Sequence, residues 1–151
     1  MLAEVLAAVA VIAIGLSALA SAIPVAGAAV SEGARLSTAT FLAGARLEEI
    51  RAAVWSETPP MDRLGVSGSP LSPPQSGNTI TFADEPGLPD PYAGYRRQVR
   101  IFDCGLPPGC AAVISKGLRQ VTVTVAYRPI TTSGVAALDK TVLVTTLVAR
   151  R

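Results

Sequence analysis

Histidine is absent from this chain of 151 residues, and cysteine occurs only twice. The first absence excludes Ser-His-Asp and Cys-His catalysis, together with every histidine-based metal site. The two cysteines, Cys104 and Cys110, are too few for a zinc centre and too widely spaced for a CxxC redox motif. No other pairing of a nucleophile with a base is recognisable. The sequence therefore predicts a protein that is not an enzyme and that needs no cofactor or metal.

An excess of charge is also missing, because 13 Lys and Arg residues face 11 Asp and Glu residues. The basic residues are scattered apart from Arg96-Arg97 and Arg150-Arg151, so we do not expect nucleic acid as a principal partner. Half of the residues are hydrophobic, which is not the composition of a disordered protein. The length allows one domain of ordinary size beside an apolar segment.

No ionisable side chain occurs from Val5 to Ser31. This stretch exceeds the roughly 20 apolar residues that cross a bilayer core, and it predicts a hydrophobic helix over residues 1–30. Glu4 lies at the tip of the helix. A carboxylate there is costly in hydrocarbon unless it is paired, so Glu4 is a functional candidate whose natural partner is a free α-amino group.

A secretory signal peptide is the alternative interpretation of this stretch, because Ala20-Ser21-Ala22 resembles a cleavage site. Signal peptides carry positive charge ahead of their apolar region, whereas the only charged side chain here is negative. We therefore favour an intact helix.

The opening residues, Met1-Leu2-Ala3-Glu4-Val5-Leu6 and on through Ile14-Gly15-Leu16, resemble the amino-terminal segment of mature type IV pilins and pseudopilins. In that family a prepilin peptidase removes a leader, the new first residue is N-methylated, and a glutamate precedes a long apolar run. The family's glutamate is usually the fifth mature residue, and here it is the fourth. Either one residue is deleted and Met1 is the processed terminus, or the true terminus differs from Met1. The resemblance implies that Glu4 pairs with the α-amino group of a neighbouring subunit.

Gly15 and Pro24 interrupt the apolar helix. Proline removes a backbone donor and clashes with the preceding turn, so we expect either a simple kink or a melted stretch between these two residues. The resemblance implies that such residues lose helix when subunits leave the bilayer and pack into a filament.

From Ser31 the pattern becomes amphipathic and predicts that the helix continues over residues 31–56, ending before Pro59-Pro60. Pairs at helical spacing, Glu32 with Arg35, Arg46 with Glu49 and Glu48 with Arg51, support it. The expected buried stripe consists of Leu36, Ala39, Ala43, Leu47, Ile50 and Val54. The run Leu47-Glu48-Glu49-Ile50-Arg51 resembles the "LEEIR" of minor pilins and pseudopilins.

Residues 57–94 are rich in Pro, Gly and Ser and predict an exposed connecting loop with one short strand at 79–82. The acidic residues Asp84, Glu85 and Asp90 raise the alternative of a calcium site. No regular loop motif supports it, so we favour a plain acidic loop.

In the region 95–151 three strands are predicted, paired antiparallel: a weakly alternating one at 97–102, a cleanly alternating one at 119–128, and one at 140–149 that is apolar on both faces. Such a sheet buries one face only if something covers it, and the amphipathic helix has the matching stripe. We therefore predict an α+β fold, which the resemblance implies to be the type IV pilin fold. In an exported globular head comprising residues 31–151, Cys104 and Cys110 would form a small disulfide loop; two free thiols are the alternative.

The resemblance implies a structural subunit of a type IV pilus. Its partners would be identical subunits in a helical filament and other pilins. It would lie in the inner membrane before assembly and in an extracellular filament afterwards. Two alternatives remain, a pseudopilin of a type II secretion system and a membrane-anchored exported binding module.

Overall fold

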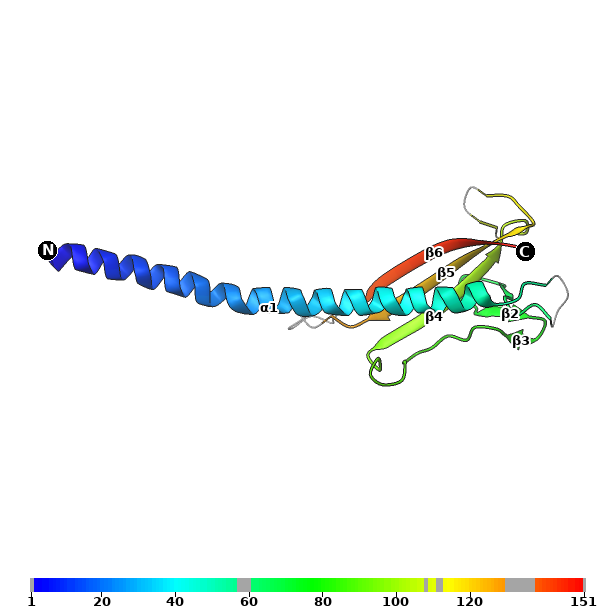
Figure 1. Cartoon of the computed structure of the whole chain (residues 1–151), viewed down its shortest axis with the longest axis horizontal. Coiled ribbons are helices and arrows are strands. Elements are labelled where there is room, and N and C mark those ends of the chain that lie inside the picture. The colour runs from blue at the N-terminus through cyan, green and yellow to red at the C-terminus, as the bar shows by residue number, and fades with distance from the viewer. Residues whose placement is uncertain (1, 57–60, 108, 111–112, 130–137, 151) are drawn as a thin grey trace.

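The structure, a computed structural model, describes residues 2–56, 61–107, 109–110, 113–129 and 138–150. One helix, α1 (Leu2–Ala52), precedes two antiparallel sheets of three strands each. The small sheet contains β1 (Val66–Ser67), β2 (Pro74–Ser76) and β3 (Thr79–Ile80), and the larger contains β4 (Tyr95–Asp103), β5 (Leu118–Tyr127) and β6 (Lys140–Ala149). The amino-terminal half of α1 projects alone, the larger sheet lies against its second half, and the small sheet lies beside β4 near the end of the helix (Figure 1). This arrangement confirms the predicted α+β class.

The helix α1 runs unbroken through Gly15 and Pro24 over 51 residues, roughly 77 Å at 1.5 Å per residue. A melted stretch between these residues is therefore not present in the isolated chain. The missing N–H of Pro24 removes one backbone hydrogen bond, and the bonds of the flanking turns keep the helix intact. The projecting half bends only gently (Figure 1).

The helix ends at Ala52, earlier than the predicted end near residue 56. The N–H of Ala53 donates to the carbonyl of Ile50 at 3.1 Å, which closes the last turn with a three-residue bond. Val54 then accepts a hydrogen bond from the N–H of Arg63 at 2.9 Å, so its carbonyl is held outside the helix. A backbone partner from the following segment thus ends the helix before the prolines are reached.

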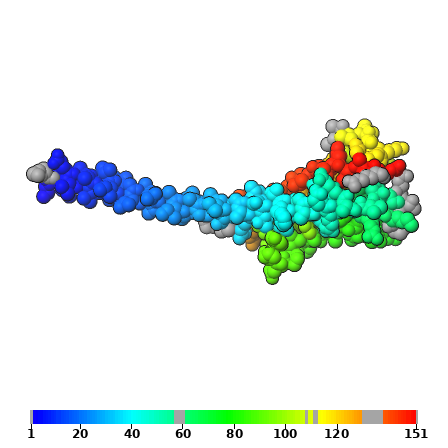
Figure 2. All heavy atoms as spheres, viewed as in Figure 1, coloured from blue at the N-terminus to red at the C-terminus, as the bar shows by residue number. Residues whose placement is uncertain are grey.

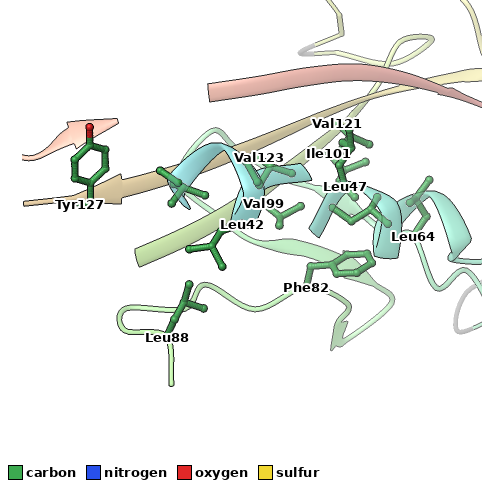
Figure 3. Packing of buried hydrophobic residues seen from close by; sticks show 14 residues of the cluster. Leu42, Leu47, Leu64, Phe82, Leu88, Val99, Ile101, Val121, Val123 and Tyr127 are labelled. Carbon is green, nitrogen blue, oxygen red and sulfur yellow. The ribbon is translucent and has the colours of Figure 1, made fainter. Parts of the chain in front are cut away.

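The main core forms where the helix crosses the larger sheet (Figure 3). Alternate residues of β5 face the helix, and Val121, Val123 and Val125 are fully buried. The register places Val123 opposite Val99 of β4 and Val144 of β6. The helix contributes the buried residues Ala39, Leu42, Ala43, Leu47 and Ile50.

Two residues of the predicted stripe lie outside this core. Leu36 is 49% exposed and Val54 is 60% exposed. Leu36 lies one turn before Ala39, where burial against the sheet begins, and Val54 follows the end of the helix. The helical spacing is correct, but the sheet covers only the part of α1 between these positions.

The segment predicted as an exposed loop over residues 57–94 is partly buried, and that prediction was wrong in this respect. It contains all three strands of the small sheet, and Leu64, Phe82 and Leu88 belong to the core. The short strand predicted at 79–82 is present as β3, although it ends at Ile80. The other two were missed, because strands of two or three residues carry no periodic signal in a Pro- and Gly-rich segment.

Candidate functional site

The most distinctive surface is the bare half of α1, residues 2–30. Among the described residues, α1 is the one helix long and apolar enough to cross a membrane, and its most apolar stretch is not buried. A signal sequence near the amino terminus would have the same character. Figure 2 shows this half as a rod of side chains without cover. An apolar surface of this size marks contact with a membrane or with another protein.

Three predicted site residues lie along this rod. Glu4 is in the first turn of α1, and Gly15 and Pro24 follow at about 16 Å and a further 14 Å along the axis. All three are exposed, so the structure places them on one rod but does not bring them together. The helix dipole favours a carboxylate at the position of Glu4. Met1 lies outside the described residues.

Polar contacts fix the point where the bare half meets the head. The Glu32 carboxylate accepts a hydrogen bond from the Tyr127 hydroxyl at 3.0 Å and pairs with Lys140 at 2.7 Å. Arg35 donates to the carbonyl of Arg128 at 2.6 Å. Burial, followed by the hydrogen bond to Glu32, raises the pKa of Tyr127. Glu32 and Arg35, predicted as a helical pair, thus hold α1 to both ends of the connection between β5 and β6.

A buried ion pair fastens the other end of the head. Arg119 of β5 donates to Asp62 at 2.6 Å, and both side chains are 7% exposed. The Arg119 guanidinium also lies 4.5 Å from the centre of the Trp55 ring, a cation–π distance. Sequence reasoning missed this cluster, because its members lie far apart in the chain and none belongs to a motif.

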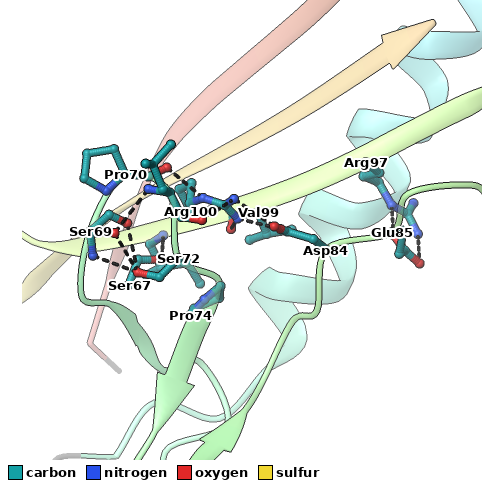
Figure 4. Close-up of polar contacts among 12 residues, drawn as sticks. Ser67, Ser69, Pro70, Ser72, Pro74, Asp84, Glu85, Arg97, Val99 and Arg100 are labelled. Carbon is teal, nitrogen blue, oxygen red and sulfur yellow. Dashed lines mark hydrogen bonds and ion pairs between the residues drawn. The ribbon is translucent and has the colours of Figure 1, made fainter.

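The acidic loop pairs with arginines of β4 (Figure 4). Asp84 accepts two hydrogen bonds from Arg100, at 2.6 and 2.9 Å, and Glu85 accepts two from Arg97, at 2.6 and 3.1 Å. Within the described ranges no group of His, Cys, Asp and Glu residues could hold a metal ion. The plain acidic loop is the better description, with two of its carboxylates serving as anchors to the sheet.

Cys104 and Cys110 form the predicted disulfide, with their Cα atoms 4.7 Å apart. Its loop carries the exposed Leu106. Comparisons with protein-family models, curated proteins and solved structures find no match to this chain. The candidate site is therefore defined by its own geometry: a bare apolar rod with a carboxylate at its tip, joined to a packed and disulfide-bonded head.

Acidic pH is expected to release the loop around Glu85. The hydrogen bonds from Arg97 lower the pKa of Glu85 below the usual 4.5, against an opposing effect of burial. A lowered folded-state pKa means that this pair contributes its full stability above about pH 4.5, and that the contribution is lost as the pH falls through the folded-state pKa. After correction for the intrinsic pH dependence of amide exchange, the protection of the Arg97 amide, whose N–H donates to the Glu85 carbonyl, should therefore fall in acid. The same pH dependence in the Glu85→Gln variant would contradict this assignment.

Proposed function

We propose that this protein is a structural subunit of a type IV pilus filament, with the pilin fold. The observation that carries the proposal is the bare half of α1, which is uncharged from Val5 to Ser31, wholly exposed, and tipped by Glu4. The head has its own core and disulfide, so the rod is not needed for the head to fold, and its apolar surface is unfavourable in water. The rod would lie in the inner membrane before assembly and in the centre of the filament afterwards.

Burial of the rods against one another would drive assembly, at roughly 25 cal/mol for each Å² of apolar surface. Glu4 would pair with the α-amino group that a prepilin peptidase exposes on a neighbouring subunit. An unpaired charge in the filament centre costs several kcal/mol, so only one axial register would be favourable. The contact joins two different surfaces of each subunit and does not close, as a helical filament requires.

Exposed apolar residues continue onto the half of α1 that carries the head. Phe41 is 64% exposed although it lies within the stretch that packs on the sheet, and Leu36 is 49% exposed. Sequence reasoning did not single out Phe41. Its exposure supports packing between subunits that extends past the bare half, because an aromatic side chain has much apolar surface to bury.

The test is the composition of filaments sheared from the cell surface. We expect electron microscopy to show thin filaments, and mass spectrometry to find this chain as their main component with a methylated Met1 at the amino terminus. Cells that make the protein but carry no surface filament, and in which it remains in the membrane fraction, would refute the pilus. A defect in protein secretion that appears when the protein is deleted from the same cells would then favour the pseudopilin.

A further inference from the structure

The two edges of the larger sheet are treated differently by the rest of the chain. The outer edge of β4 is occupied: Glu85 and Arg97 exchange two backbone hydrogen bonds at 2.8 and 2.9 Å, and Leu88 donates to the carbonyl of Tyr95 at 3.1 Å. Further along, Ile101 donates to the hydroxyl of Ser67 at 3.1 Å. Figure 4 shows the segments that lie along this edge. The chain therefore closes the β4 edge with its own loops.

The outer edge of β6 has no such cover in the described part of the chain. Among those residues, no hydrogen bond joins the backbone from Lys140 to Ala149 to any segment other than β5. Every second residue of an antiparallel edge strand directs its N–H and C=O away from its neighbour. Over ten residues this is a long row of backbone groups. From Thr141 to Ala149 no charged side chain protects it, although long edges normally carry such protection.

The core is also less well buried at the β6 edge than at the β4 edge. In β4, Val99 and Ile101 are 1% and 0% exposed, because loop residues extend the core beyond that edge. In β6 the inward residues Val142, Val144, Thr146 and Val148 are only half-buried, and the register places Thr146 in the row of Ile101. On the opposite face, Leu143 and Leu147 are 63% and 47% exposed. A strand added beside β6 would meet apolar side chains on both of its faces.

We propose that β6 receives an extended, mainly apolar strand of another polypeptide, paired antiparallel to it and continuing the sheet. Backbone hydrogen bonds would supply binding, and side-chain positions along the strand would supply selectivity, as in other cases of strand addition. The inference goes beyond the proposed filament role, because it concerns the side of the head and does not require the chain to polymerise.

A second copy of this chain fits the edge poorly. The described part of a copy offers one free edge of comparable length, its own β6. Antiparallel pairing of two β6 strands needs a two-fold axis perpendicular to the sheet, which would point the two bare helices in opposite directions. Such a pair could not insert both rods into one membrane from the same side. The occupant is therefore a strand from a different protein, an exclusion that rests on the proposed insertion of the rods into one membrane.

A groove at the end of β6 could bind one charged residue of the added strand. It has a volume of about 450 Å³ and lies between the end of α1 and the end of β6, lined by residues 51–55 and 147–149. The Arg51 guanidinium borders it, donating to Thr146 at 3.3 Å and to Glu48 at 2.8 Å, with its side chain 47% exposed. A guanidinium has five N–H donors, so Arg51 can accept a further carboxylate. Antiparallel pairing places that acidic residue near the amino end of the added strand.

The test uses the full chain in detergent micelles and a synthetic ten-residue peptide of alternating Val and Thr with one Glu near its amino end. We expect saturable binding and slower amide exchange along β6. A peptide N-methylated at alternate positions should not bind, and one with Lys in place of Glu should bind about tenfold more weakly. The variant Arg51→Gln should lose the preference for Glu, and Arg63→Gln, which changes an exposed arginine that does not line the groove, should keep it.

Three outcomes would overturn the proposal: no saturable binding, equal binding of the N-methylated peptide, or no change in β6 exchange when the peptide binds. Sedimentation of the full chain provides a further check. A dimer whose β6 amides are protected without peptide would identify a second copy as the occupant, and would also overturn the proposal. None of these results depends on whether filaments form, so the two proposals can fail separately.

Discussion

Replacing Glu4 by alanine should abolish filament assembly or reduce it severely while the subunit remains folded and membrane-bound. In the proposed filament the Glu4 carboxylate neutralises the α-amino group of a neighbour inside an apolar bundle. Removal of one partner of a buried pair costs about 3–5 kcal/mol, because the other charge stays buried without compensation. Since 1.4 kcal/mol is a factor of ten in an equilibrium constant, each contact would weaken by at least about a hundredfold. The measurement is the ratio of sheared filament to membrane-bound subunit, by immunoblotting and electron microscopy.

Glu48→Ala is the matched control for this experiment. It makes the same chemical change on the same helix, but the Glu48 side chain is 68% exposed and pairs on the surface with Arg51. Exposed pairs of this kind contribute little, so Glu48→Ala filaments should be normal. Normal filaments from the Glu4→Ala strain would show that Glu4 does not determine assembly.

Replacing Arg119 by methionine should destabilise the head by about 3–5 kcal/mol, since it leaves the buried Asp62 carboxylate without its cation. Asp62 would keep the hydrogen bond from the N–H of Leu64 at 3.1 Å, which is not a substitute for a charge. Trp55 is the only tryptophan and lies against the Arg119 guanidinium, so its fluorescence follows this cluster directly. Urea unfolding of the full chain in micelles, monitored through Trp55, measures the loss.

Two further variants separate the buried pair from a general effect of removing an arginine. Arg63→Met removes an exposed arginine next to Asp62 and should change stability by less than about 0.5 kcal/mol. Asp62→Asn combined with Arg119→Met removes both charges, and it should be more stable than Arg119→Met alone. Equal stability of Arg119→Met and Arg63→Met would mean that the buried pair does not anchor the head.

Regular elements with a strong period could be predicted from the sequence. The strand at 140–149 is predicted to the residue, because it is a short apolar run rich in Val and Thr, and β5 is predicted within one residue, because Val and Thr alternate cleanly there. The helix is equally clear up to its last turn. The end of the helix could not be predicted, because the N–H of Arg63 donates a backbone hydrogen bond to the carbonyl of Val54 in competition with the helix. No local pattern in the sequence predicts that bond.

Contacts between distant segments could not be predicted. The Arg119–Asp62 pair, the Tyr127–Glu32 hydrogen bond and the arginine anchors of Asp84 and Glu85 all depend on which strand edge each loop follows. Single charged residues in a sequence carry no information about such partners. The same limit applies to the candidate site: Glu4, Gly15 and Pro24 are visible as interruptions of an apolar run, whereas the exposure of Phe41 depends on which side of the helix the sheet covers.

The way the head lies alongside α1 also determines how the molecule would bear a mechanical load. The buried helix residues Ala39, Leu42, Ala43, Leu47 and Ile50 follow one another along the axis. A pull on the amino-terminal rod would therefore act parallel to this row and shear all of its contacts at once, whereas a perpendicular pull would peel them apart one after another. The contacts of Glu32 with Tyr127 and Lys140 stand at the end of the row that receives the force first. A subunit built in this way resists tension along its length better than force from the side.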